Sequence, residues 1–509
     1  RLKLVRSGRS CVSVYVRSII CRCRINFMAI PVFVHWFRRD LRLADNPALA
    51  AAVQAARAAD GRLLLLYIHD DETPGEWRWG GAHRWWLNRS LKSLADSIGA
   101  KDNQLVLKSG NAKAVLEQLA DTLPIRGVFW NRCYEPFAIE RDKAIKSQFK
   151  DRDITVESFN GSLLNEPWTI ETKSGGPYKV FTPYWRAVLE KGDISKPIQA
   201  HKTLPPAPEL AGEALADWGL HPTAPDWSQG LADPWTPGED HARDRLYRFL
   251  DDRIVDYREA RDYPGSHGTS RISPYLHWGE ISPRQIWHMT VSAHGHPNVS
   301  KTPEPYLREI CWREFCYHLL YHFPTLPTEP LNERFGEFPW REDEQSLTAW
   351  QRGQTGIPIV DAGMRELYET GWQHNRVRMI VGSFLVKNLL LPWTEGERWF
   401  WDTLVDGDLA NNAAGWQWIG GCGADAAPYF RVFNPILQGE KFDKQGKYVR
   451  RYVPELTKLP DKYIHKPWEA PKDVLAQAGI RLGETYPKPI VDLKGSRQRA
   501  LDAFEEIKR

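Results

Sequence analysis

The 509-residue sequence is poor in cysteine and has none in a paired arrangement. Only seven cysteines occur, and three of them lie within the first 27 residues. The others are Cys133, Cys311, Cys316 and Cys422, whose spacing suggests neither a disulfide framework nor a zinc site. This composition favours a reducing compartment. We accordingly predict no bound metal.

Long apolar runs are also missing. No stretch approaches the roughly 18 consecutive apolar residues that a membrane-spanning helix needs, and 26% of the residues are charged. The chain is long enough for two or three domains with sizeable cores. We therefore predict a soluble globular protein without a membrane role.

Acidic residues are absent from residues 1–27, which hold seven lysines and arginines. Because the first methionine is Met28, we interpret this leader as a translated upstream or vector-derived segment before the natural start. An Arg- and Ser-rich organelle presequence is the alternative. A secretory signal is disfavoured because Arg17 interrupts the short apolar stretch. Without the leader, the formal net charge of +4 becomes slightly negative.

A Gly-x-Gly-x-x-Gly turn is missing after the first strand-like segment, which runs directly into Phe37-Arg-Arg-Asp-Leu-Arg-Leu. A dinucleotide on a Rossmann phosphate loop is therefore not expected in this half. Up to about residue 160, β-rich runs alternate with helical patterns, which predicts a parallel sheet wrapped by helices. The predicted strands are Pro31–Trp36, Arg62–His69, Gln104–Lys108, Gly127–Asn131 and Thr155–Phe159, and the helices include Asn46–Ala58 and His83–Ile98.

A proline-rich stretch separates this half from the rest of the chain. Eight prolines occur between Asp193 and Asp240, which favours a long connector on the surface. Beyond Glu239 the pattern is helical almost throughout. We predict an α/β domain at residues 28–160, a connector at 161–238 and an all-helical domain at 239–509.

The segment from Asp406 to Trp418 combines carboxylates, amides and two tryptophans at what reads as the start of one helix. Residues two apart on a helix point to nearly opposite sides, so Trp416 and Trp418 cannot serve the same surface. One can face a buried partner while the other faces a cavity. For an arbitrary Trp-x-Trp pair, the simpler interpretation is that both lie in the core.

Two further segments place polar and aromatic residues on single helix faces. Glu309 and Trp312 are three apart, and Asn375, Arg378 and Met379 fall on one side of another helix. Taken alone, Glu309 is typical of a solvated helix face.

Small hydroxyl side chains gather in the segment Gly268-Thr-Ser-Arg-Ile-Ser273, which follows Tyr257. Hydroxyls and backbone donors near a turn suit a phosphate or pyrophosphate. A helix cap is the simpler explanation for the Thr-Ser pair.

Taken together, these segments resemble the photolyase and cryptochrome family, and the resemblance covers the chain from Met28 to about Pro489. It rests on Gly268–Leu276, Trp312–Phe315, His374–Met379 and Asn411–Trp418. Agreement at four ordered segments is highly specific. It implies a Rossmann-like α/β antenna domain, a long connector, and a helical domain that holds FAD in a folded conformation beneath a cavity for a flipped-out pyrimidine dimer.

The resemblance also implies roles for individual residues around FAD. Arg378 and Asp406 correspond to the ion pair beside the flavin ring, against which Asp408 also lies, and Asn412 to the amide near N5. An amide there can favour a reduced flavin, whereas plant cryptochromes carry an acid. The implied contacts to the phosphates and ribityl chain are Tyr257, Thr269, Ser270, Ile272 and Ser273.

On the substrate side, the resemblance implies that Trp312 and Trp418 sandwich a cyclobutane dimer and that Glu309 hydrogen-bonds a dimer carbonyl. Asn375 and Met379 would be further cavity contacts. The arginines that correspond to family residues near flanking DNA phosphates are Arg261, Arg376 and Arg431.

An electron relay from the surface to the flavin is implied at Trp416, Trp393 and Trp340. Because the chain has 23 tryptophans, many of them must serve packing. The relay would reduce the cofactor before catalysis, and repair itself would not need it.

The reaction implied is light-dependent DNA repair by a deoxyribodipyrimidine photo-lyase. Photoexcited reduced FAD passes one electron to the dimer, two inter-ring bonds split, and the electron returns. The flavin carries the hard chemistry, and the protein supplies position and electrostatics. We expect a monomer that acts on dimer-containing DNA without a protein partner, in the cytoplasm of a bacterial-type cell.

Three alternatives stay open: a cryptochrome-type blue-light photoreceptor, a six-four photoproduct photolyase, and a single-strand-preferring DASH cryptochrome. Glu309 and Asn412 disfavour the photoreceptor, and Trp418 disfavours the DASH type. Six-four enzymes typically show a histidine pair where this chain has His374-Asn375.

An antenna chromophore is implied for the α/β domain. The segment from Gly80 to Leu87 resembles class III photolyases and plant cryptochromes, which favours methenyltetrahydrofolate over a deazaflavin. Phe137-Ala138 replaces the Asn-Glu of the best-known folate binders, so another flavin or an empty site is an alternative. Trp85 and Trp86 are equally well explained as interface core.

Overall fold

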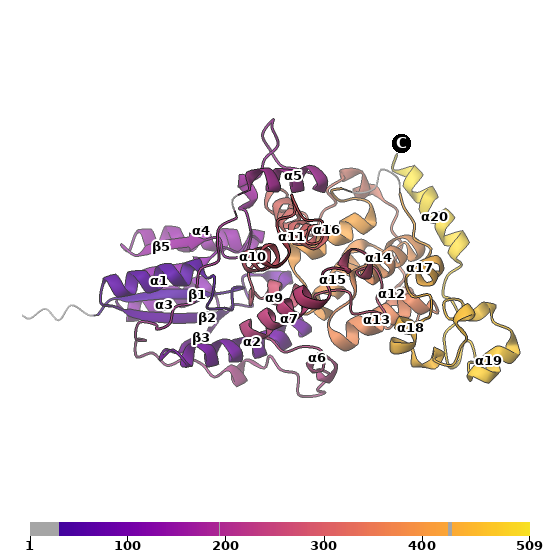
Figure 1. Ribbon diagram of the computed structural model, residues 1–509, viewed down its shortest axis with the longest axis horizontal. Helices are drawn as coiled ribbons and strands as arrows, with labels where there is room; N and C mark the ends of the chain where they lie inside the picture. Colours follow the sequence, from indigo (N-terminus) through magenta and orange to yellow (C-terminus); the bar gives the residue numbers. More distant parts are fainter. Residues whose placement is uncertain (1–29, 193, 426–429, 509) are drawn as a thin grey trace, which may run out of the picture.

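The computed structural model describes residues 30–192, 194–425 and 430–508. The predicted leader at residues 1–27 lies outside the described residues. Figure 1 shows an α/β part joined to a larger helical part, with the C-terminal helices at the end farthest from the sheet.

The first part is built on one parallel sheet of five strands in the order β3-β2-β1-β4-β5. Because helices cover both faces of such a sheet, its inner strands are apolar almost throughout, as in the leucine run of β2. The strands are β1 (Val32–Phe37), β2 (Arg62–His69), β3 (Leu105–Ser109), β4 (Ile125–Asn131) and β5 (Thr155–Phe159).

Helices flank the sheet on both faces (Figure 1). The first begins where Asn46 accepts a hydrogen bond from the backbone N–H of Leu49 and Pro47 occupies the first turn. These helices are α1 (Pro47–Ala58), α2 (Gly81–Gly99), α3 (Ala112–Thr122) and α4 (Pro136–Lys150). The predicted strands and helices are thus found within a few residues of their expected positions.

The carboxyl ends of β1 and β4 mark the point where the strand order reverses, which is where open α/β sheets commonly bind ligands. Here the protein's own polar side chains fill that position. The Asn131 amide donates to Asp40 at 2.5 Å, and Arg38 forms two hydrogen bonds with Asp142. This packing explains why no glycine-rich phosphate loop is needed at this point.

Between the two parts, the chain forms α5 (Phe181–Lys191), α6 (Gln229–Ala232) and short 3-10 turns. The helix α5 packs on α11 (Glu304–His322) of the helical part. The boundaries of the predicted connector at 161–238 stay a prediction.

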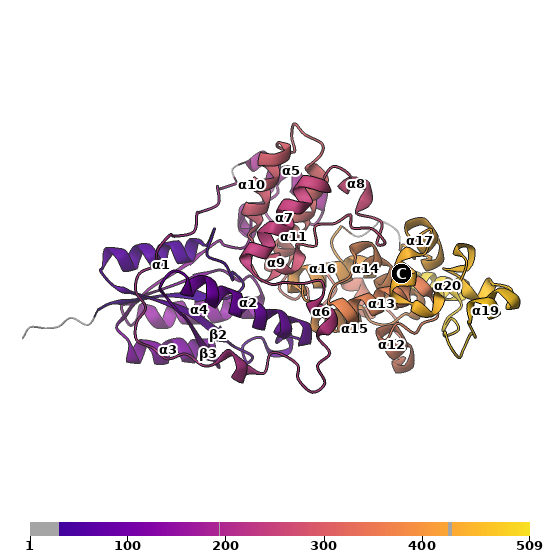
Figure 2. The same cartoon turned by 60° about the horizontal axis from the view of Figure 1, so that its bottom comes forward.

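The second part is helical, with α7 to α20 packed around two buried clusters. Figure 2 shows α7, α10 and α11 on one side of it and α12 to α18 on the other. Apart from α11, its α-helices are α7 (Glu239–Asp252), α8 (Tyr257–Ala260), α9 (Ser273–His277), α10 (Pro283–His294), α12 (Glu344–Gln351), α13 (Pro358–Thr370), α14 (Asn375–Ser383), α15 (Trp393–Thr403), α16 (Leu409–Gly420), α17 (Pro435–Phe442), α18 (Lys447–Tyr452), α19 (Lys472–Ala478) and α20 (Leu493–Glu506). The π-helix η5 (Phe384–Leu389) continues α14, and the 3-10 turns of the chain are η1 (Gly75–Trp77), η2 (Pro167–Thr169), η3 (Leu215–Trp218), η4 (Glu333–Glu337), η6 (Pro454–Leu456), η7 (Asp461–Tyr463) and η8 (Pro467–Glu469).

The predicted fold class, an α/β domain followed by an all-α domain, is confirmed. Within the described ranges, no helix is both long and apolar enough to cross a membrane.

Candidate functional site

The helix α16 separates its two tryptophans as its periodicity predicts. Asp408 caps the helix by accepting from the backbone N–H of Asn411 at 3.0 Å. Trp416 is only 2% exposed, whereas Trp418 is half-buried. The two indoles therefore serve different surfaces.

Arg378 and Asp406 form the ion pair that the resemblance implies. One guanidinium nitrogen of Arg378 lies 2.9 Å from both carboxylate oxygens of Asp406. The hydroxyl of Ser273 donates to the same carboxylate at 2.5 Å and accepts from the indole of Trp372 at 3.2 Å. This network joins α9, α14 and the turn before α16.

Asp408 is buried and ionised. Burial opposes its ionisation, but contact with His277 and the positive charge of Arg39 outweigh that cost, so the pKa of Asp408 lies well below its ordinary value. Tyr317 donates a hydrogen bond to the carboxylate. Arg39, which follows β1, lies 3.5 Å from Asp408 and also pairs with Glu135. One arginine of the α/β domain therefore stabilises the negative charge of a carboxylate at the start of α16.

Asn412 has a fixed amide orientation. Its NH₂ group donates to the backbone carbonyl of Glu397 at 2.9 Å, so its carbonyl oxygen faces away from that helix. This oxygen accepts no hydrogen bond from the residues that the structure describes. It is thus available as an acceptor for a ligand N–H.

The remaining residues implied at FAD differ in their burial. Tyr257 and Ile272 are buried, and the Tyr257 ring packs at 5.5 Å from Phe249 and 5.4 Å from Tyr306. Ser270 is buried and Thr269 is half-buried in the turn before α9.

An acid and an arginine meet beside α11. Arg261 donates to Glu309 at 2.6 Å, and both side chains stay about one-third exposed. The Arg261 guanidinium lies 5.5 Å from the ring centre of Tyr257. On α14, Asn375 is exposed and Met379 is half-buried.

The two other arginines implied at DNA phosphates differ in their contacts. Arg376 donates to Asp262 at 2.7 Å and lies over the ring of Phe442. Arg431 is exposed, with its guanidinium 4.8 Å from the ring centre of Phe433.

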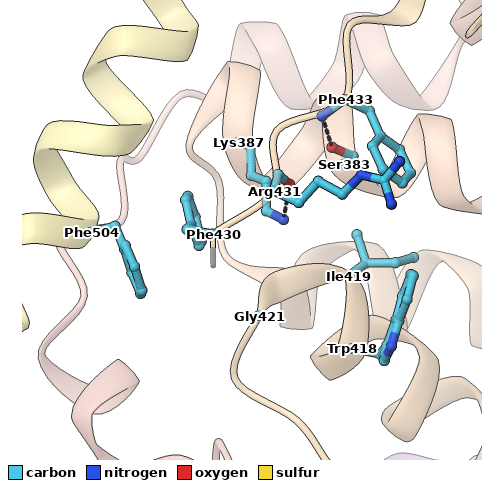
Figure 3. Close-up of a pocket in the computed structure, with 9 residues that line it drawn as sticks. All are labelled: Ser383, Lys387, Trp418, Ile419, Gly421, Phe430, Arg431, Phe433 and Phe504. Atoms are coloured by element: carbon cyan, nitrogen blue, oxygen red, sulfur yellow. Dashed lines mark hydrogen bonds between the residues drawn. The ribbon is translucent and has the colours of Figure 1, made fainter. Parts of the chain in front are cut away.

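Trp418 and Arg431 line the same pocket, shown in Figure 3. Lys387, from the π-helix η5, donates to the backbone carbonyl of Arg431 at 2.6 Å. Burial lowers the pKa of Lys387 to about 7. Nothing in the sequence pattern marked this lysine, although π-helices often occur at functional sites.

The three tryptophans of the implied relay share one side of the helical domain. Trp393 and Trp416 belong to one buried cluster, and half-buried Trp340 packs against it. Gly396 lies one turn after Trp393 on α15, and the Trp416 indole packs on it so closely that a Cβ there would meet Cη2 at 2.1 Å. Trp340 is held near α15 because the next residue, Arg341, donates to the carbonyl of Leu390 at 2.8 Å.

The close packing of Trp416 on Gly396 gives a stability prediction. Replacing Gly396 with alanine should destabilise the protein by about 1–3 kcal/mol, because the new methyl group overpacks against Trp416. The matched control is Gly415→Ala in α16, where a Cβ meets nothing within 4 Å. That change should be neutral or stabilise by up to about 1 kcal/mol, because alanine favours helix. Chemical denaturation measures both, and equal effects would contradict the prediction.

Arg39 is the other residue that the sequence interpretation did not assign. The motif Phe37-Arg-Arg-Asp-Leu-Arg-Leu directly after a buried strand was a usable signal, because side chains at that position lie at the carboxyl edge of the sheet. Phe181 lies within the predicted connector at 161–238, and no sequence motif marks it as a functional residue.

Together the fold and these contacts define a two-domain cofactor protein whose candidate cofactor residues lie in its helical domain. Residues 33–209 match the family described as DNA photolyase. Residues 306–506 match the FAD binding domain of DNA photolyase.

Related proteins agree with these matches. The deoxyribodipyrimidine photo-lyase of Agrobacterium fabrum is 51% identical over 94% of this chain and 98% of its own. Cryptochrome-2 of Arabidopsis thaliana is 39% identical over 93% of this chain and 78% of its own. The crystal structure of a bacterial class III photolyase from Agrobacterium tumefaciens superposes with a TM-score of 0.89, at 50% identity, over 96% of this chain and 99% of that one. The chain belongs to the DNA photolyase and cryptochrome family, which confirms the resemblance and the enzyme class.

The residues present fit FAD. The Arg378–Asp406 pair offers a donor and an acceptor side by side, and Arg378 remains about one-quarter exposed. The Asn412 carbonyl oxygen adds an acceptor without a protein donor among the described residues. A flavin ring edge carries both kinds of partner, so this set of groups suits it.

Proposed function

We propose that this protein repairs cyclobutane pyrimidine dimers in DNA under light. The observation that carries the proposal is the pair Trp312 and Trp418, which lie on different helices and are both half-buried. Flipping a base out costs a few kcal/mol, less for damaged bases. Stacking returns roughly 1–3 kcal/mol per base. Two accessible indoles can therefore offset the extrusion of two linked bases.

Polar residues at the edge of the proposed dimer site would orient the dimer and its flanking DNA. Glu309 already forms a hydrogen bond with Arg261, and a dimer carbonyl or N–H that enters there would join an existing charged pair. Asn375 and Met379 complete the accessible face of α14. Arg376 and exposed Arg431 would contact the phosphates that flank the lesion.

When bound, FAD would supply the photoexcited electron donor. Arg378 and Asp406 would hold it, Asp408 would keep a fixed negative charge beside it, and Asn412 would accept from its N–H. We further propose that Trp416, Trp393 and Trp340 deliver electrons from the surface. Tyr257, Thr269, Ser270, Ile272 and Ser273 would form the phosphate and ribityl side.

Two alternatives are less well supported. A six-four enzyme would use a histidine that can carry a proton, but burial lowers the pKa of His374 to about 3 and its ring caps α14. A photoreceptor of the cryptochrome type would not require the partly exposed pair Glu309–Arg261.

The antenna chromophore, the cellular location and the oligomeric state are proposed from the family resemblance. We propose methenyltetrahydrofolate rather than a deazaflavin at the α/β domain, a cytoplasmic location and a monomer. Trp85 and Trp86 are fully buried, and Trp86 donates to Glu280 of the helical domain at 3.3 Å. The interface interpretation therefore accounts for these two tryptophans without a chromophore.

Glu309→Ala is expected to lower repair of a thymine-dimer oligonucleotide about tenfold to hundredfold, since a hydrogen bond to a charged group contributes about 1.5–3 kcal/mol. The flavin spectrum should not change. The assay uses reduced enzyme under near-ultraviolet or blue light.

The matched control is Glu304→Ala on the same helix, whose carboxylate pairs with Arg258 and Arg308. It should keep wild-type repair. Unchanged repair in the Glu309 variant would remove this residue from the mechanism. No repair by the reduced wild-type enzyme would instead favour the photoreceptor.

A further inference from the structure

The segment formed by residues 178–181 leads into α5 and ends at Phe181, the first residue of that helix. It is fixed to α11, because the backbone N–H of Tyr178 donates to Nε2 of His318 at 2.9 Å. The other ring nitrogen of His318 lies 2.9 Å from the carbonyl of Pro167. One nitrogen must accept and the other donate, so the ring is neutral, and burial lowers the pKa of His318 to about 4.

The last residue of this segment supports Trp312. The ring of Phe181 stacks on the indole with ring centres 3.9 Å apart and planes within 11°. Phe181 is only 1% exposed, with Phe315 against its ring edge and Arg308 over it. It therefore occupies one face of Trp312, so a ligand could stack only on the opposite face.

The same segment supports Trp418 through one intermediate residue. The carbonyl of Lys179 accepts from the backbone N–H of Asp425 at 3.0 Å. The carbonyl of Asp425 in turn accepts from the indole N–H of Trp418 at 3.1 Å. An indole has a single hydrogen-bond donor, so this bond sets the rotation of the ring.

We infer that residues 178–181 position both tryptophans before a ligand binds, and that this order favours a strand with a pyrimidine dimer over an undamaged strand. This inference rests on the proposed function. The segment touches no reacting atom and acts only through Trp312 and Trp418. Indoles that are already held in place favour binding, because neither has to be ordered when the ligand enters.

The test is the binding of reduced, FAD-loaded variants to two oligonucleotides that differ only in one thymine dimer. Phe181→Leu should weaken binding to the damaged strand about threefold to tenfold, the range for one aromatic pair, and leave binding to the undamaged strand unchanged. Phe181→Tyr keeps the aromatic ring, so this variant should still bind the damaged strand more tightly than the undamaged one. Trp185→Leu is the matched control, because this buried residue of the same helix packs on Trp287 and not on Trp312.

The outcomes separate this inference from the proposed function. A wild-type protein that binds both strands equally would overturn both. A wild-type protein that discriminates, together with a folded Phe181→Leu variant that discriminates equally well, would overturn the positioning role alone. Equal losses in the Phe181 and Trp185 leucine variants would do the same, since they would reflect general loosening of α5.

Discussion

Asp406→Ala is expected to be purified without flavin absorbance and to unfold at a lower denaturant concentration than the wild type. The carboxylate accepts two hydrogen bonds from Arg378 and one from Ser273. Its removal leaves the partly buried Arg378 guanidinium without its carboxylate partner, although Nε still donates to the carbonyl of Gln373. We expect a cost of about 1–3 kcal/mol. The donor and acceptor pair offered to the flavin would be lost at the same time. The 450 nm region of the absorption spectrum and chemical denaturation measure the two effects.

The control is Asp262→Ala, which removes a more exposed partner from Arg376. Exposed ion pairs contribute about 0–1 kcal/mol, so this variant should keep its flavin and most of its stability. An Asp406 variant with a full flavin complement would show that the ion pair is structural only.

The second large effect concerns the proposed relay. Trp393→Phe should abolish the photoreduction of oxidised flavin, while chemically reduced enzyme still repairs a dimer. Phenylalanine keeps most of the packing in the buried cluster but is much harder to oxidise than an indole. The decay of oxidised-flavin absorbance under blue light, with a thiol as donor, measures the first step, and the repair assay measures the second.

Trp399→Phe is the matched control. It changes an indole on the same helix α15, but Trp399 is only partly buried: it packs at the edge of the cluster and stacks on the exposed ring of Tyr368. It should photoreduce as the wild type does. If Trp393→Phe loses repair by prereduced enzyme as well, the residue serves mainly to pack Trp416.

Local sequence patterns were sufficient to predict the strands and helices of the fold. The leucine run of β2 and the capped start of α1 are decided within a few neighbouring residues, so sequence alone located them. The same holds for α16, where helical periodicity predicts that Trp416 and Trp418 face different surroundings.

Contacts between distant segments could not be predicted in this way. The stacking of Phe181 on Trp312 joins a segment expected to be a surface connector to the middle of a long helix. Nothing in the local sequence of α5 encodes that partner, since a buried phenylalanine suits any apolar neighbour. The burial of Lys387 is hidden for the same reason: its carbonyl acceptor belongs to a loop far along the chain.

Arg39 has a consequence for how the two domains could be exchanged between relatives. It lies in the α/β domain, yet it supplies positive charge to Asp408 at the start of α16, the helix that carries Asn412, Trp416 and Trp418. A helical domain combined with a foreign partner that lacks this arginine would retain a buried carboxylate without its cation. The two domains therefore share one charge balance, so an exchange of either domain has to preserve this arginine.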